Sequence, residues 1–203
     1  MNAIGAYFSP SGGTKRACEL VGGLFDATEY VDLGGRTRAQ RNFSKDELLV
    51  LAVPVYAGQM PAVPGLLDGL KGENTPCVIL ATYGNRHYDE TLAQVKRILG
   101  EQGFRCAGAA AVITPHIFAP TLGAGRPDEQ DMEKLGQFAQ GVKEKAGRRG
   151  LGGSRCARQS QSAPQARRAG EEGPGLGHLP GLRHLRQGLP HRGHGPEDSH
   201  VDG

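Results

Sequence analysis

Short apolar segments alternate along the first 146 residues with stretches in which apolar residues recur every three or four positions. The short segments predict β-strands, and the one at residues 48–53 is apolar throughout, as expected of a strand covered on both faces of a sheet. The predicted strands are residues 3–8, 28–33, 48–53, 77–81 and 104–114.

Helical spacing follows four of these strands. The apolar positions of the predicted helices are Ala17, Leu20, Val21 and Leu24; Val63, Leu66, Leu67 and Leu70, in a helix starting at Pro61; Leu92, Val95, Ile98 and Leu99; and Met132, Leu135, Phe138, Ala139 and Val142. The alternation predicts a three-layer, doubly wound α/β domain with a parallel sheet. Ligands of such domains bind beyond the carboxyl ends of the strands, so the loops after the first, third, fourth and fifth strands form the candidate site.

The composition changes abruptly near residue 147. All Phe and Tyr residues lie before this point, whereas the 57 residues after it hold 13 of the 32 Gly and no Lys, Ile or aromatic residue. They also carry the basic excess that gives the chain its formal net charge of +3. Such a segment cannot form a packed core. We therefore expect one domain over residues 1–146 and a low-complexity, disordered tail over residues 147–203.

Several classes of protein are disfavoured by the sequence. No apolar run approaches the roughly 20 residues of a membrane span, and the first residues lack the pattern of a signal peptide, so we expect a cytoplasmic protein with no membrane partner. Cys18, Cys77, Cys106 and Cys156 stand singly, without the spacing of a zinc or iron–sulfur site. Buried free thiols and no bound metal are therefore expected.

The first candidate loop, Ser9-Pro-Ser-Gly-Gly-Thr14, joins a strand directly to a helix. Its hydroxyl groups, unobstructed backbone N–H groups and helix N-terminus suit a phosphate monoester. The spacings of a Walker loop and of a dinucleotide-binding fingerprint are both missing. An ordinary serine-capped turn explains the same residues equally well.

Two further loops place tyrosine and glycine at the ends of neighbouring strands. They are Pro54-Val-Tyr-Ala-Gly-Gln-Met-Pro61 and Thr82-Tyr-Gly-Asn-Arg-His-Tyr-Asp89. Aromatic side chains offer stacking area, and glycine-flanked N–H groups can reach the heteroatoms of a flat ring, so this pattern favours a planar ligand. The alternative is that the tyrosines only cover the sheet edge.

These motifs together resemble a known family. The loop at residues 9–14 is similar to the T/S-x-T/S-G-x-T phosphate loop of flavodoxins, and the two tyrosine loops resemble those that sandwich the flavin ring. The combination VPVYAGQMP with TYGNRHYDE resembles the flavodoxin half of bacterial and archaeal proteins in which a ferredoxin domain with 4Fe-4S clusters follows. The resemblance implies a flavodoxin-like five-stranded sheet of order 2-1-3-4-5, FMN as cofactor, and electron transfer.

The resemblance also implies which residues bind FMN. The phosphate would be held by Ser9, Ser11, Gly12, Gly13 and Thr14. The ring would be held by Pro54, Val55, Tyr56, Ala57, Gly58, Thr82, Tyr83, Gly84, Asn85, Tyr88 and Asp89. Arg86 and His87 depart from the usual pattern of these loops, and His116, after the fifth strand, is given no role.

The tail resembles a coding sequence translated out of frame. If Leu is encoded by CTG and the next codon begins with C, a shift of one base reads TGC, which encodes Cys. Residues from His178 onward then become TCLACGTCAKVCPTGA, with the C-x-x-C-x-x-C-x-x-x-C-P spacing of a bacterial ferredoxin. We therefore expect a 4Fe-4S cluster only in an unshifted parent protein. The competing interpretation is a genuine basic tail that contacts nucleic acid.

The favoured function is FMN-dependent electron transfer with a redox partner protein, of ferredoxin or reductase type, and no nucleic-acid partner. The first alternative is an NAD(P)H-dependent FMN or quinone reductase on the same fold. The second is a receiver-like signalling or binding module. A receiver needs an aspartate at the end of the third strand, where this chain has Val53 and Pro54.

Overall fold

A computed structural model describes residues 1–35 and 39–148 of the chain. Strands and helices alternate through this part as the sequence pattern predicts. In chain order the elements are β1 (Asn2–Tyr7), α1 (Gly13–Gly23), β2 (Glu29–Asp32), β3 (Arg41–Phe43), β4 (Glu47–Pro54), β5 (Leu70–Gly72), β6 (Thr75–Tyr83), α2 (Thr91–Glu101), β7 (Phe104–Ile113) and α3 (Glu129–Arg148).

Five strands form one parallel sheet in the order β2-β1-β4-β6-β7. If only the five strands of this sheet are numbered along the chain, their order is 2-1-3-4-5, as predicted. The flavodoxin-like fold class is therefore confirmed. The central strand β4 is buried along seven of its eight residues, because helices cover both faces of the sheet. All five strands end at the same edge, and this edge brings the candidate loops together.

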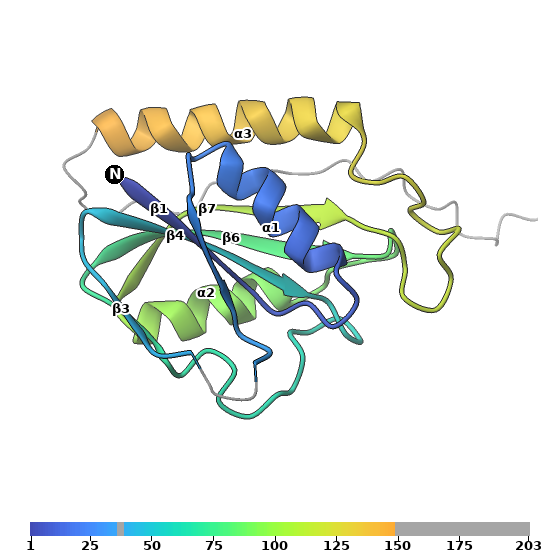
Figure 1. Cartoon of the computed structure of the whole chain (residues 1–203), viewed down its shortest axis with the longest axis horizontal. Coiled ribbons are helices and arrows are strands. Elements are labelled where there is room, and N and C mark those ends of the chain that lie inside the picture. The colour runs from blue at the N-terminus through green and yellow to red at the C-terminus, as the bar shows by residue number, and fades with distance from the viewer. Residues whose placement is uncertain (36–38, 149–203) are drawn as a thin grey trace, which may run out of the picture. The chain divides into compact units, whose positions relative to one another are not determined.

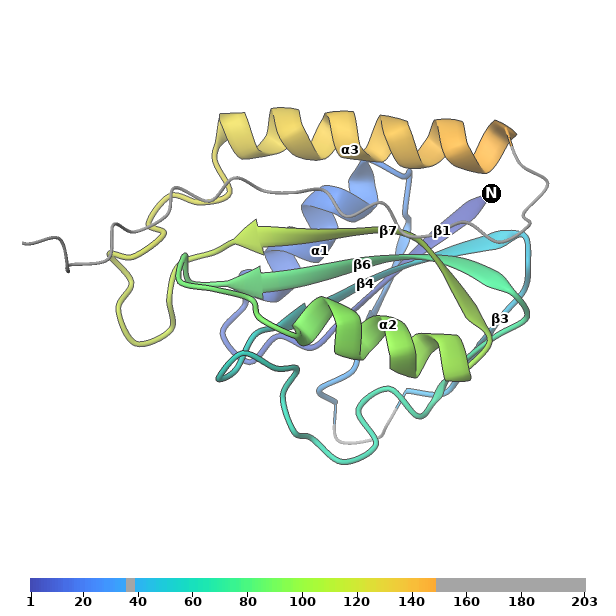
Figure 2. The ribbon, with the colours of Figure 1, turned by 180° about the vertical axis from the view of Figure 1, so that it is seen from behind.

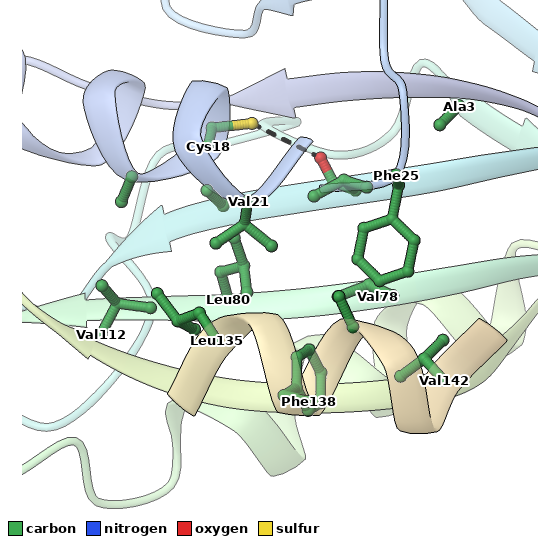
Figure 3. Close-up of a cluster of buried hydrophobic side chains, with 14 of the residues drawn as sticks. Ala3, Cys18, Val21, Phe25, Val78, Leu80, Val112, Leu135, Phe138 and Val142 are labelled. Carbon is green, nitrogen blue, oxygen red and sulfur yellow. Dashed lines mark hydrogen bonds between the residues drawn. The ribbon is translucent and has the colours of Figure 1, made fainter. Parts of the chain in front are cut away.

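Helices α1 and α3 pack on one face of the sheet and α2 packs on the other (Figures 1 and 2). Successive side chains of a strand point to opposite faces. Val50 of β4 therefore joins the cluster under α1 and α3, which includes Val21 and Phe138 (Figure 3), while Leu49 joins the cluster under α2. The two clusters fix the sheet between its helices.

The helix predicted to start at Pro61 does not form. Residues 64–69 are hydrogen-bonded turns instead, with N–H···O bonds of the i to i+3 type such as Leu66 to Val63 at 3.2 Å. Pro64 has no N–H group to donate, and Gly65 has a φ of +70°, so a continuous helix is disfavoured here. Leu66 is nevertheless buried beneath the sheet, as predicted.

A second, two-stranded parallel sheet of β3 and β5 was not predicted. Its strands have three residues each, which is too short for a periodic signal. Helix α3 continues to Arg148, two residues beyond the predicted end of the domain, and the rest of the predicted tail lies outside the described residues. In the described ranges no helix has the length and apolar character needed to cross a membrane.

Candidate functional site

A cavity of about 350 Å³ lies at the carboxyl edge of the main sheet. Its volume falls within the range of about 300–1,000 Å³ that is usual for small-molecule sites. Four loops contribute to its lining, those that follow β1, β4, β6 and β7. The lining residues are Ser11, Thr14, Pro54, Val55, Tyr56, Ala57, Thr82, Tyr83, Gly84, Thr114, Pro115, His116, Ile117 and Phe118.

The structure thus brings nine of the predicted site residues together around one cavity. Seven others lie in the same loops without lining it: Ser9, Gly12, Gly13, Gly58, Asn85, Tyr88 and Asp89. Contact of either group with FMN stays a prediction. Within the second group, Ser9, Gly58, Tyr88 and Asp89 make contacts that hold the loops in place.

The loop after β1 presents free N–H groups at the start of α1. Gly12, which precedes the helix, has a φ of +85°, and a Cβ at this position would meet nothing within 4 Å. The N–H of Lys15 donates to the Ser9 Oγ at 2.9 Å, and that of Arg16 donates to the Gly12 carbonyl. In the described part of the chain the N–H groups of Gly13 and Thr14 have no acceptor. Both belong to the first helical turn, where an anion is favoured.

The Thr14 hydroxyl, predicted to bind phosphate, is already engaged with the sheet. It lies 2.7 Å from the hydroxyl of Thr82 at the end of β6, and both residues are buried. Thr82 in turn donates to the Val53 carbonyl at 3.4 Å, so Thr14 donates to Thr82. This pair ties the first loop to the sheet and leaves other donors for a phosphate. They are the Gly13 and Thr14 N–H groups, the exposed Ser11 hydroxyl, and the Ser9 hydroxyl, which accepts the Lys15 N–H and can still donate its own proton.

Tyr56 sits at the base of a tight hairpin after β4. Its N–H and carbonyl both pair with Gln59, at 2.8 and 3.1 Å. The two residues at the tip, Ala57 and Gly58, have φ values of +49° and +82°, as in a type I′ turn. The turn leaves the Tyr56 side chain 40% exposed at the cavity.

Tyr83, the last residue of β6, is the second cavity tyrosine and begins the loop that follows this strand. Its ring makes an edge-to-face contact with Tyr88 at 5.6 Å between centroids. The His87 ring stacks on Tyr88 at 5.5 Å between centroids. Burial raises the pKa of the Tyr83 phenol, and Tyr88 adds to the shift. The phenol therefore keeps its proton at neutral pH and can donate a hydrogen bond.

The two tyrosine loops are joined at Gly58. The Gly58 carbonyl accepts the N–H of Glu90 at 3.1 Å and the hydroxyl of Thr91 at 3.3 Å. Asp89 packs so closely on Gly58 that a side chain at residue 58 would overlap its carboxylate. Gly58 and Asp89 thus hold the Tyr56 and Tyr83 loops in a fixed relation.

The loop after β7 contributes five lining residues, 114–118. The sequence predicted that this loop belongs to the site, but none of these five residues was predicted to bind the ligand. His116 pairs with Ala119 in a short hairpin, and its Nδ1 accepts the N–H of Phe118 at 3.2 Å. This contact fixes the orientation of the His116 ring in the hairpin. The available sequence signal was the apolar pair Ile117-Phe118 between two prolines, in a loop where polar residues are usual.

Arg126 closes this loop where α3 begins. Its guanidinium binds the Asp131 carboxylate through two N–H groups, and it also pairs with Asp128 at 3.2 Å. The hydrogen bond from Arg126 lowers the pKa of the Asp131 carboxyl. Asp128 and Asp131 exchange backbone-to-carboxylate hydrogen bonds at 2.9 and 3.0 Å, which caps the helix.

The chain is similar to solved structures of other proteins. An apo-form NADH:FMN oxidoreductase aligns over 71% of this chain and 90% of its own, with 13% identity and a TM-score of 0.51. Oxidised flavodoxin 2 from Bacillus cereus aligns over 71% of this chain and 99% of its own, with 17% identity and a TM-score of 0.49. No protein-family description and no curated sequence matches the chain. At these identities the likeness concerns the flavodoxin-like fold.

Proposed function

We propose that this domain binds FMN and transfers electrons to and from a partner protein. The observation that carries the proposal is the cavity at the carboxyl edge of the sheet. Through Ser11 and Thr14 it joins the start of α1 to two tyrosine-bearing loops, so that an anion site and aromatic walls border one space. A planar ring with a phosphate side chain matches both halves of this site.

The residues present fit the cofactor. Ser11 and the N–H groups of Gly13 and Thr14 would hold the phosphate, and the open space at Gly12 lets an anion approach the helix. Tyr56 and Tyr83 would pack against the ring and exclude water from it. Bound FMN would supply the redox chemistry, so no side chain needs to act as a nucleophile.

A binding titration tests this proposal. We expect the full chain to bind FMN more tightly than riboflavin, which lacks the phosphate. Replacing Ser11 by alanine should raise the Kd for FMN by about tenfold, the size of a hydrogen bond to a charged group, and leave the Kd for riboflavin unchanged. Ser44→Ala, in an exposed residue between β3 and β4, is the matched control. A chain that binds neither flavin would contradict the proposal.

An NAD(P)H-dependent FMN or quinone reductase is the second candidate. The observation that favours it is the likeness to the NADH:FMN oxidoreductase, which has the same architecture. Rapid mixing of the FMN-loaded protein with NADH or NADPH without oxygen distinguishes the two functions. Electron transfer with a partner protein predicts slow flavin bleaching, whereas a reductase predicts bleaching within seconds.

We further propose that the parent protein relays electrons through a 4Fe-4S ferredoxin domain, and that residues 147–203 are its frameshifted remnant. The support is the cysteine spacing of the shifted frame. The chain as it stands does not fit such a cluster, because Cys156 is the single cysteine after residue 147. Resequencing the gene near codon 147 tests this point. An uninterrupted frame without four cysteine codons at the expected spacing would refute it.

A further inference from the structure

The loop after β7 exposes large apolar side chains at the mouth of the cavity. Phe118 is 88% exposed and Ile117 is 49% exposed, and both line the cavity together with Tyr56 and Tyr83. Water contact with such surface is unfavourable, and an exposed apolar group beside a pocket marks a place where a ligand or partner binds.

These side chains are held in position by a short hairpin, residues 116–119. The His116 N–H donates to the Leu122 carbonyl at 2.9 Å, and the Ala119 N–H donates to the His116 carbonyl at 3.3 Å. The Phe118 N–H donates to the His116 Nδ1 at 3.2 Å. The loop at the cavity mouth is therefore organised before any ligand arrives, which lowers the entropic cost of binding.

The hairpin is also fixed against the loop that carries Tyr83. A Cβ on Gly84 would lie 2.7 Å from the Cβ of His116. The two loops can approach this closely because residue 84 has no side chain. The Thr114 N–H donates to the Tyr83 carbonyl at 2.9 Å. Because β6 lies between β4 and β7 in the sheet, the Tyr56 hairpin and the 116–119 hairpin flank the Tyr83 loop.

We propose that the 116–119 hairpin is a third wall of the ring site, in which Phe118 and Ile117 pack against the flavin ring. This inference rests on the proposed function. The occupant follows from the position of the side chains, because Phe118 lines the same cavity as the two tyrosines, whereas the equally apolar Leu122 of the same loop does not. Aromatic side chains that line a cavity favour a flat aromatic ligand.

The proposal assigns the hairpin to the ring and not to the phosphate. The phosphate donors lie at the start of α1, and no residue of the hairpin belongs to that group. Loss of the Phe118 ring should therefore weaken the binding of FMN and the binding of riboflavin by the same factor. Loss of the Ser11 hydroxyl should weaken the binding of FMN and leave the binding of riboflavin unchanged. The contributions of the ring site and the phosphate site can therefore be measured separately.

The test compares Kd values for FMN and riboflavin in the full chain and in the variants Phe118→Ala and Leu122→Ala. We expect Phe118→Ala to raise both Kd values by about two- to tenfold, the range that ring stacking supports. Leu122 is 53% exposed on the same loop but outside the cavity, so Leu122→Ala should leave both values unchanged. Since both side chains are exposed, the melting temperature should not change in either variant.

Three results would overturn the inference. Unchanged Kd values in Phe118→Ala would show that the flavin ring does not contact Phe118, and would leave the proposal of flavin binding intact. Equal rises of both Kd values in Phe118→Ala and Leu122→Ala would show that the effect does not come from a contact between the Phe118 ring and the flavin. Failure of the unaltered chain to bind either flavin would remove the proposed function, and the third wall with it.

Discussion

At the scale of single residues, Cys18 shows how burial in the core sets chemistry. Its side chain is fully buried on the inner face of α1 (Figure 3). Its Sγ lies 3.6 Å from the carbonyl oxygens of Ala6 and Val50. Desolvation raises the pKa of the Cys18 thiol to about 12. The thiol is therefore neutral and a poor nucleophile at physiological pH.

This burial predicts a loss of stability at high pH. An unfolded thiol titrates near pH 8.5, so the unfolded state loses its proton first and the contribution of Cys18 disappears as pH rises from about 8.5 towards 12. We expect the free energy of unfolding to fall by about 2 kcal/mol more by pH 10 in the unaltered chain than in Cys18→Ala. Urea unfolding in the presence of a reductant measures the free energy of unfolding of both proteins at each pH. If the free energy of unfolding changes with pH in the same way in both proteins, the raised pKa of the Cys18 thiol is contradicted.

Gly84 is a second residue with a measurable role. An added methyl group would collide with His116, and the loops after β6 and β7 would have to separate. We expect Gly84→Ala to lower the free energy of unfolding by about 1–3 kcal/mol and to weaken flavin binding. Gly100→Ala in α2 is the control, because its Cβ would meet nothing within 4 Å, and it should be neutral or stabilising. Equal changes in the free energy of unfolding for Gly84→Ala and Gly100→Ala would refute the close contact between Gly84 and His116.

At the scale of elements, the start of α3 depends on its ion pair. The side chains of Arg126 and Asp131 are largely buried, at 28% and 15% exposure. We expect Arg126→Ala to lower the free energy of unfolding by about 1–2 kcal/mol at pH 7. Because Arg126 lowers the pKa of Asp131, this difference should disappear as pH falls below the usual aspartate range.

Another arginine on the surface supplies the control for this ion pair. Arg97 pairs with Glu101 at 3.0 Å on α2, and both side chains are mostly exposed. Solvent weakens such a pair, so Arg97→Ala should change the free energy of unfolding by less than about 0.5 kcal/mol. If both arginine variants lose the same stability, the Arg126 pair does not anchor α3.

The elements also show why some predictions succeeded. The uninterrupted apolar run of β4 requires burial on both faces, and that requirement alone places it inside a parallel sheet. The segment at residues 61–70 has the apolar spacing of a helix, but Pro64 and Gly65 favour turns. Its leucines reach the core without a helix, because burial depends on side-chain position and not on backbone hydrogen bonding.

At the scale of the whole molecule, sheet order places loops together that are far apart in sequence. The strand alternation predicted that the loops after β1, β4, β6 and β7 would share one edge, and the cavity lies there. The contribution of Ile117 and Phe118 to the cavity could not be predicted, because an apolar pair in a loop is also compatible with burial in the core. The engagement of Thr14 with Thr82 depends on a contact between residues 68 positions apart.

The central claim is that this edge of the sheet binds FMN, and a crystal structure of the protein grown with FMN tests it most directly. We predict ring density in contact with Tyr56, Tyr83 and Phe118, and phosphate density within hydrogen-bond distance of the Gly13 and Thr14 N–H groups. An FMN molecule bound elsewhere, or a cavity filled by the protein's own side chains in crystals saturated with FMN, would contradict the account.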